Sequence, residues 1–352
     1  MAPTLAAREG WSRLERRTLS RHARGTAKRP GRRAGRGEAH RTGPNSGAYV
    51  GPRGEDVAVP ATFPVLPIRD ERVRRIASAA AKGGGGLLGV GTAVAGAAVG
   101  VMVVQARQAR RAIGPRRGVP PYADGRYLPP GSDAARGTSL RLAVLGDSGA
   151  AGLGAEHAQG TAGGRLAAEL AAASHRPVLL TNVAVVGAQS RDLEAQVERV
   201  LAVRPHVAVI MIGANDVTHL VRPQKSVQLL SEAVARLREA GSEVVVGTCP
   251  DLGTVRPIAA PLRQVAGRMS RELAAAQDIG VRRAGGRPVP LAEKIGALFA
   301  AEPEVYFSAD RFHPSAEGYA ACAHAMLPDV LEAVGLARPE SGTGPVPALP
   351  GA

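Results

Sequence analysis

Short apolar runs alternate with amphipathic stretches over the C-terminal part of this chain. Four short, mostly apolar runs are typical of strands that are buried on both faces; they cover residues 140–146, 177–187, 206–213 and 242–248. Between and after these runs, apolar residues recur at helical spacing, as at Val227, Leu230 and Val234. The spacing predicts helices over residues 164–174, 190–202, 226–240, 258–278 and 315–335.

This alternation predicts an α/β domain over residues 139–337. Strands that alternate with helices form a parallel sheet with right-handed crossovers, and helices cover both of its faces. A segment of about 200 residues suits one such domain. No internal repeat is visible in it.

Residues 1–82 lack this periodicity and are predicted to be a disordered basic segment. They hold 18 Lys and Arg against 7 Asp and Glu, whereas the other 270 residues hold 27 against 23. Such a segment buries too little apolar surface to offset the entropy of an ordered chain. Most of the net charge of +15 therefore lies outside the predicted domain, for which we expect no nucleic-acid partner. Three possibilities stay open for residues 1–70: a tail that binds anionic lipid or nucleic acid, a solvated extension, or a start codon chosen too far upstream.

Residues 83–106 form an uncharged run of 24 residues. About 20 such residues cross the hydrocarbon core of a bilayer as a helix, so we expect a transmembrane helix and a membrane-associated protein. Gly96 and Gly100 are four residues apart, a spacing that lets helices approach closely. A Gly-rich linker and a late signal peptide cleaved near Ala106 are the alternatives. Lys and Arg are almost equally frequent on the two sides of the run, so the side of the membrane that holds the domain is not predicted.

Two further segments and the cysteines complete the domain prediction. Pro and Gly dominate residues 107–138, which predicts a linker, and residues 338–352 are predicted to be a disordered tail. Cys249 and Cys322 lie outside any Cys-x-x-Cys pair or His cluster, so we expect no zinc or other metal site. Both are expected to be small buried apolar side chains, with a disulfide between them as the alternative.

Small and polar residues gather at the predicted ends of the strands and in one C-terminal loop. The first strand ends in Gly146-Asp147-Ser148, the second at Gly187 and the third in Gly213-Ala214-Asn215-Asp216. A loop before the last predicted helix contains Asp310-Arg311-Phe312-His313-Pro314. In open α/β sheets, ligands bind outside the carboxyl ends of the strands, so we expect these four segments to lie together.

The residue types in these segments are those that acyl transfer requires. Ser148 is the predicted nucleophile, and it needs a base to take its proton and a group to orient that base. His313 is the predicted base and Asp310 the orienting carboxylate. The backbone N–H groups of Ser148 and Gly187 and the side-chain amide of Asn215 are the predicted donors to the oxyanion.

Other interpretations of Ser148 fit the chain less well. A protease of the trypsin type places its His and Asp before its Ser, whereas here the serine comes first. Ala150 breaks the Gly-x-Ser-x-Gly pattern of an α/β-hydrolase elbow, and no Lys-Ser or Lys-Thr follows as in a phosphate-binding loop. Of the neighbouring carboxylates, Asp147 is expected to support the turn beneath Ser148, and Asp216 to order its own loop.

The four segments resemble the sequence blocks of the SGNH, or GDSL, hydrolase superfamily. That family carries Gly-Asp-Ser, Gly, Gly-x-Asn-Asp and Asp-x-x-His-Pro in this order, and all four blocks are present between residues 139 and 337. One departure is Gly149, which stands where Leu often follows the serine. The resemblance implies a three-layer αβα sandwich with a flavodoxin-like sheet, and ester hydrolysis through an acyl-enzyme without a metal or organic cofactor. The string GDSGAAGLG and the apolar run before it look like a membrane-associated actinobacterial branch.

The small number of aromatic residues in the predicted domain indicates which class of substrate it accepts. The predicted domain holds only five, all between Phe299 and Tyr319. They offer no evident platform on which a sugar could stack, which favours small or lipid-like acyl esters as the substrate. A carbohydrate or cell-wall O-acetyl esterase is the alternative enzyme, and a membrane-tethered binding module with an inactive triad is the alternative outside enzymes.

Overall fold

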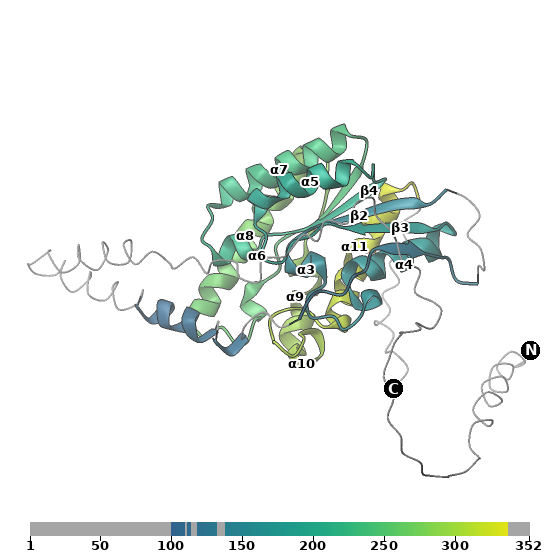
Figure 1. Cartoon of the computed structure of the whole chain (residues 1–352). Coiled ribbons are helices and arrows are strands. Elements are labelled where there is room, and N and C mark those ends of the chain that lie inside the picture. The colour runs from purple at the N-terminus through teal and green to yellow at the C-terminus, as the bar shows by residue number, and fades with distance from the viewer. Residues whose placement is uncertain (1–99, 110, 114–117, 132–137, 337–352) are drawn as a thin grey trace, which may run out of the picture. The chain divides into compact units, whose positions relative to one another are not determined.

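A six-stranded sheet organises the part of the chain that the computed structural model describes, residues 100–109, 111–113, 118–131 and 138–336 (Figure 1). Its strands are β1 (Gly125–Tyr127), β2 (Leu140–Gly146), β3 (Val178–Asn182), β4 (Val207–Met211), β5 (Glu243–Gly247) and β6 (Arg287–Val289). They lie in the order β1-β3-β2-β4-β5-β6, and all neighbours are parallel except β1, which runs antiparallel to β3. Without β1 this is the flavodoxin-like order, in which ligands bind at the carboxyl ends of the strands.

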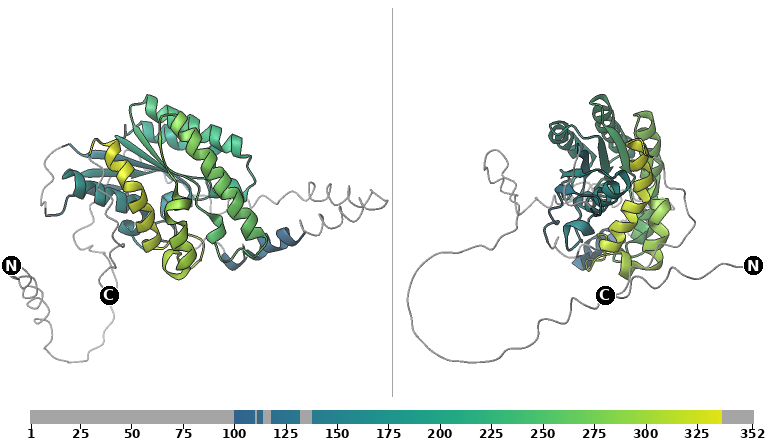
Figure 2. Two further views of the ribbon diagram at one scale, coloured as in Figure 1. Left: turned by 180° about the vertical axis from the view of Figure 1, so that it is seen from behind. Right: turned by 90° about the vertical axis from the view of Figure 1, so that its right-hand side faces the viewer.

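Helices connect the strands and cover both faces of the sheet. The long helices are α4 (Ala162–Ser174), α5 (Leu193–Leu201), α7 (Pro223–Glu239), α8 (Leu262–Arg283), α9 (Leu291–Ala301) and α11 (Ala316–Ala333). The short elements are α3 (Ser148–Ala151), α6 (Ala214–Thr218), α10 (Pro303–Tyr306) and the 3₁₀ turns η2 (Ala158–Gly160), η3 (Ser190–Asp192) and η4 (Leu252–Thr254). Figure 1 places α5 and α7 together on one side of the sheet, and the reverse view in Figure 2 shows α11, in yellow, crossing the other side.

Successive side chains of β2 enter two different cores, because neighbouring residues of a strand point to opposite faces. Leu142 and Val144 pack in a core with residues of α4, α9 and α11. Ala143 and Leu145 pack in a second core with residues of α5 and α7. The mostly apolar sequence of the strand therefore reflects burial on both faces.

The predicted strands and helices are present, and most of their ends differ by a few residues. The largest shift concerns the helix expected over residues 258–278, which is α8 (Leu262–Arg283). Pro261 has no N–H to donate within a helix, so the helix begins after it. At the other end the helix continues past Gly280 because Val281 is fully buried in the second core.

The linker predicted over residues 107–138 is wrong for Gly125–Tyr127. These three residues form β1, in which Arg126 is paired with Leu179 of β3. A three-residue strand is too short for a period-two pattern to be recognised among prolines and glycines. The same shortness hid β6, while α9 and α10 lie in a stretch for which the sequence predicted no element.

The helical residues 100–109 and 111–113 precede β1 and contact the domain. The side-chain amide of Gln105 donates to Ala260 O and accepts from Leu262 N at the start of α8, and Ala109 is buried. Of the predicted transmembrane segment 83–106, only residues 100–106 belong to the described part of the chain, and the predicted segments 1–82 and 338–352 lie outside it. Among the described residues, no helix combines the length and apolar character that a bilayer crossing requires.

Candidate active site

The turn between β2 and α3 places Ser148 at the carboxyl end of a central strand. Asp147 caps the helix, since its side chain accepts a hydrogen bond from Gly149 N at 2.9 Å, and Ser148 is the first residue of α3. Gly146 has a φ of 136°, and a Cβ there would lie 1.9 Å from Met211 O on β4. Only glycine fits this close approach of two strands, which explains the glycine in the first block.

Ser148, His313 and Asp310 form a continuous hydrogen-bonded chain. His313 Nε2 lies 3.0 Å from Ser148 Oγ, and His313 Nδ1 lies 2.6 Å from Asp310 Oδ2. Ser148 and His313 are both buried. The structure thus brings together the predicted nucleophile, base and orienting carboxylate, although the first two are 165 residues apart in the sequence.

The loop between α10 and α11 holds Asp310 with three further hydrogen bonds. Its Oδ1 accepts from Ser308 Oγ at 2.9 Å and from the backbone N–H groups of Phe312 and His313, both at 2.8 Å. Burial alone would raise the pKa of Asp310, but the hydrogen bonds from the His313 side chain and from these backbone groups outweigh it. The pKa of Asp310 therefore lies well below its usual value, and the group is a carboxylate at neutral pH.

The ionised Asp310 fixes the proton on the histidine ring. A carboxylate can only accept hydrogen bonds, so His313 Nδ1 carries the proton that it shares with Asp310. In the neutral ring Nε2 then has a free lone pair, and this nitrogen faces Ser148 Oγ. The ring of Phe312 packs edge-on against the imidazole, with 4.9 Å between the ring centroids, and helps to hold its plane.

The other predicted oxyanion donors lie on the loops after β3 and β4. Gly187 has a φ of 87° in a turn closed by the bond from Ala188 N to Val185 O. The side-chain amide of Asn215 donates to Ala188 O at 3.0 Å, so the two loops are tied together. Among the described residues, no hydrogen bond joins Gly187 or Asn215 to Ser148.

Asp216 is buried beside these loops and binds three groups around them. Its carboxylate accepts from Ser190 N at 3.1 Å, from Ser190 Oγ at 2.6 Å and from Ser226 Oγ at 3.0 Å. These bonds connect α6, η3 and α7. Asp216 lies outside the hydrogen-bonded chain of Ser148 and fixes the loop that carries Asn215.

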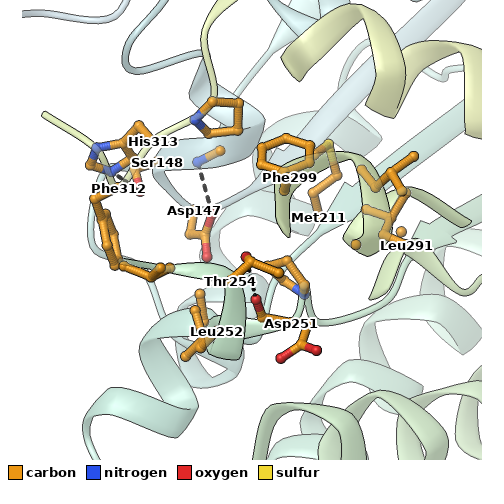
Figure 3. Close-up of a pocket in the computed structure, with 18 of the residues that line it drawn as sticks. Asp147, Ser148, Met211, Asp251, Leu252, Thr254, Leu291, Phe299, Phe312 and His313 are labelled. Atoms are coloured by element: carbon orange, nitrogen blue, oxygen red, sulfur yellow. Dashed lines mark hydrogen bonds between the residues drawn. The ribbon is translucent and has the colours of Figure 1, made fainter. Parts of the chain in front are cut away.

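An apolar pocket with a volume of about 110 Å³ opens beside Ser148 and His313 (Figure 3). The loop after β5, including η4, forms one wall and α9 forms another. Its apolar lining residues are Met211, Ile212, Leu252, Val255, Leu291, Ile295, Phe299, Phe307 and Phe312. The carboxylate of Asp251 in the wall is engaged by Arg271 at 2.8 Å and by Gly253 N at 2.7 Å. Most of the surface that the pocket offers a ligand is therefore hydrocarbon.

Comparison with known proteins assigns the family. The model of the GDSL-like lipase/acylhydrolase family matches residues 144–321, about half of the chain. The GDSL-like esterase Rv1075c of Mycobacterium tuberculosis is 43% identical over 246 residues, which are 68% of this chain and 78% of that protein. The chain belongs to the GDSL-like lipase/acylhydrolase family. It is a hydrolase of ester bonds, and the resemblance drawn from the four sequence blocks, including the actinobacterial one, is confirmed.

Two solved structures are similar over the domain at lower identity. TesA is 21% identical, with 55% of this chain and 99% of that chain covered and a TM-score of 0.44. The acetylxylan esterase Axe2 from Geobacillus stearothermophilus is 20% identical, with 58% and 99% covered and a TM-score of 0.43. Structural similarity at this identity and TM-score adds nothing to the family assignment.

In this GDSL-family hydrolase a buried glutamine that the sequence did not predict supports the turn before Ser148. Gln196 of α5 accepts from Gly146 N at 2.7 Å and donates to Gly146 O at 3.0 Å. One feature of the sequence indicates this role, namely a polar residue on an apolar helical face. Gln196 shares that face with Leu193, Val197 and Val200, and all four are buried. Asn182 acts in a similar way on α3, since its amide donates to Ala150 O at 2.9 Å.

Neither a metal cluster nor a disulfide is found in the described part of this family member. No group of three or more His, Cys, Asp and Glu side chains there is placed to hold a metal ion. Cys249 and Cys322 are both free thiols and both buried, as expected of small apolar side chains. Burial raises the pKa of Cys249 well above its usual value and that of Cys322 to about 12, so neither is a reactive thiolate at neutral pH.

Proposed function

We propose that this GDSL-family hydrolase cleaves carboxylic acid esters with small or lipid-like acyl groups through a Ser148 acyl-enzyme. The observation that carries the proposal is the hydrogen-bonded chain of Ser148, His313 and Asp310 at the mouth of an apolar pocket. Such a chain activates a hydroxyl that is a weak nucleophile by itself. The inactive binding module is not retained, because the chain belongs to a family of ester hydrolases.

In the first step Ser148 Oγ attacks the ester carbonyl while His313 Nε2 takes its proton. The imidazolium that forms is stabilised by Asp310 and then gives the proton to the leaving alcohol. In the second step water attacks the acyl-enzyme, and the same nitrogen takes a proton from water and returns one to Ser148. The carboxylic acid leaves, and the resting state is restored.

The negative charge on the carbonyl oxygen needs donors that are already in place. We assign this role to the backbone N–H groups of Ser148 and Gly187 and to the side-chain amide of Asn215. The bond from Asn215 to Ala188 O supports the assignment, since it leaves the amide its second N–H and holds it beside the Gly187 turn. One such donor contributes roughly 3–4 kcal/mol to stabilisation of the transition state.

The apolar pocket supports an acyl chain as the group bound beside the nucleophile. The pocket has a volume of about 110 Å³ and a mostly apolar lining, so several acyl carbons can be buried in it. Each buried methylene contributes about 0.8 kcal/mol. We therefore expect rates to rise with acyl length from acetyl to hexanoyl esters.

The test is hydrolysis of p-nitrophenyl esters from C2 to C16 by the full chain, with Ser148→Ala and Ser174→Ala variants. The control residue Ser174 ends α4, and its loss should leave the rates unchanged. Ser148→Ala is expected to lower kcat by about 10⁴-fold or more. Hydrolysis that survives in the folded Ser148→Ala variant would refute the nucleophile, and rates that do not rise from C2 to C6 would refute the binding of acyl chains in the pocket.

The proposed location is the membrane, through residues 83–106. The uncharged run in the sequence supports it, as do Val101 and Val104, which are 47% and 50% exposed on the helical residues before β1. A deletion of residues 83–99 keeps Gln105 and its contacts with the start of α8. We expect the full chain in the membrane fraction and the deletion variant in the supernatant with its esterase activity intact. Equal distribution of both between the fractions would exclude this anchor.

A carbohydrate O-acetyl esterase is the second candidate, and one observation favours it. The described domain includes Tyr122 and Tyr127, which the predicted domain bounds had excluded. The expectation that sugars are not the substrate depends on a count of five aromatic residues, and that count omits these two tyrosines. Release of acetate from acetylated xylan, compared with hydrolysis of p-nitrophenyl acetate at equal enzyme concentration, distinguishes the two candidates.

A further inference from the structure

A second hollow lies at the β1 edge of the sheet and shares no lining residue with the pocket beside Ser148. Its volume is about 600 Å³, within the range of roughly 300–1,000 Å³ that small-molecule sites occupy. It is formed by β1 and its flanking residues, by η2 and by the first half of α4. We name it the β1 groove; its side chains that can stack or form hydrogen bonds are Tyr122, Asp124, Arg126, Tyr127, Gln159 and Arg165.

Two aromatic rings line the β1 groove. Tyr122 is 76% exposed, which leaves an apolar ring face in contact with water. Tyr127 is partly buried, and its hydroxyl donates to Ala123 O at 2.8 Å, so its ring is held in one orientation. Rings of this kind, apolar on the face and polar at the edge, are suited to ligands that present both C–H and O–H groups.

The polar side chains of the groove offer both donors and acceptors. Arg126, Arg165 and Gln159 supply N–H donors, and Asp124 supplies carboxylate oxygens. Asp124 Oδ1 already accepts from Asn182 N at 2.8 Å, which fixes the carboxylate and leaves its remaining acceptor capacity for a ligand. Burial raises the pKa of Glu169 on the next turn of α4, and the charges of His324 and Arg165 act against that rise. A groove with mixed and nearly balanced charges favours a ligand rich in hydroxyl groups over an ion.

We propose that the β1 groove binds a neutral oligosaccharide. Pyranose rings would stack on Tyr122 and Tyr127 through their C–H faces, while Arg126, Arg165, Gln159 and Asp124 bind the hydroxyl groups. The site goes beyond the proposed esterase function, because it needs neither Ser148 nor hydrolysis of the bound sugar. It would hold the domain on a glycan while the esterase site acts on an ester carried by that glycan or by its surroundings.

The groove is also connected to the support of the nucleophile. Asp124 bonds to the backbone of Asn182, and the Asn182 amide bonds to Ala150 O of α3. The segment that contains η2 follows α3 directly in the chain, and Leu153 within it accepts a hydrogen bond from the buried Tyr319 hydroxyl at 2.7 Å. A bound glycan therefore lies against elements that also position Ser148.

The experiment measures binding separately from hydrolysis. Saturation-transfer NMR and calorimetric titration are carried out on the full-length Ser148→Ala protein with xylohexaose, cellohexaose, chitohexaose, maltohexaose and, as an acidic probe, hexagalacturonate. Second substitutions in this background are Tyr122→Ala, Tyr122→Phe and Gln159→Ala. Leu220→Ala is the matched control, because Leu220 is 74% exposed and lines neither pocket. Circular dichroism of each variant establishes that it is folded.

At least one neutral hexaose is expected to bind, with an affinity that changes little between low and high salt. Tyr122→Ala should weaken this binding about tenfold, whereas Tyr122→Phe, which keeps the ring, and Leu220→Ala should leave it within about twofold. The proposal is overturned if no neutral hexaose binds, if Tyr122→Ala binds like the control, or if only hexagalacturonate binds with a steep salt dependence. Because Ser148 is absent throughout, failure of the esterase assignment leaves this result unaffected.

Discussion

Gly296 lies on α9 and lines the apolar pocket, so a side chain at this position would shorten the pocket. A Cβ built there meets only the Cβ of Asp251, at 3.9 Å, which is an ordinary van der Waals distance. The first carbon of a new side chain therefore fits without strain, and further carbons extend toward the space that an acyl chain would use. We predict that Gly296→Leu folds normally and excludes acyl chains longer than acetyl.

The size of the effect follows from the pocket volume. The four side-chain carbons of leucine occupy about as much space as four carbons of an acyl chain, so in a pocket of this size they displace about that number. At about 0.8 kcal/mol per buried methylene, a hexanoyl ester loses about 3 kcal/mol of binding in the transition state. That loss lowers kcat/KM about 100-fold. An acetyl ester places a single carbon beyond the carbonyl and loses at most about fourfold.

The assay compares kcat/KM for p-nitrophenyl acetate, butyrate and hexanoate in the full-length wild type, Gly296→Leu and Gly296→Ala. Alanine adds one carbon and favours the helix by about 1 kcal/mol, so it controls for the loss of glycine itself. The ratio of hexanoate to acetate should fall more than about 20-fold with leucine and less than about fivefold with alanine. An unchanged ratio in a folded leucine variant would mean that acyl chains do not enter this pocket, and the reasoning would be refuted.

Three further predictions concern stability and the thiols. The pKa of Asp310 is lowered in the folded state, so the wild type should have a higher free energy of unfolding than Asp310→Asn. This difference should be constant above about pH 5. It should shrink as the pH falls below the ordinary value of 3.8 toward the folded-state pKa; urea unfolding across pH tests this, and a loss that grows on acidification would contradict it. Gln196→Ala removes the partner of the buried Gly146 N–H, while the Gly146 C=O keeps its bond from Val185 N. The variant should therefore lower the free energy of unfolding by about 2 kcal/mol, again measured in urea. Cys249 and Cys322 should react with an aromatic disulfide reagent only in denaturant, and fast labelling of the native protein would show that they are less protected than their burial implies.

The residues of the hydrogen-bonded chain could be predicted from the sequence because their geometry is partly local. Asp310 and His313 are three residues apart in one short loop, and the backbone of that loop itself brings their side chains together. Ser148 is far away in the chain, but it ends a strand with a clear apolar pattern. The rule that ligand sites lie at the carboxyl ends of parallel strands then placed it near the others.

The features that the sequence did not predict depend on contacts with no local pattern. β1 is stabilised by pairing with β3, which no three-residue stretch specifies. Gln196 matters because of Gly146, which is 50 residues away, and a glutamine alone does not indicate that partner. The apolar pocket is likewise formed by segments from five different parts of the chain, so its volume and lining follow only from their packing.

The separation of Ser148 and His313 by 165 residues has a consequence for biosynthesis. A ribosome-bound chain holds the serine long before the histidine loop has been made, and α11, whose Tyr319 reaches back to Leu153, is made later still. A nascent or truncated chain therefore holds the proposed nucleophile without its proposed base, and we expect it to hydrolyse esters far more slowly than the complete domain. If the proposed mechanism holds, full hydrolytic activity requires that synthesis has passed α11 and that Ser148 and His313 have met, so esterase turnover would report completed folding of this domain.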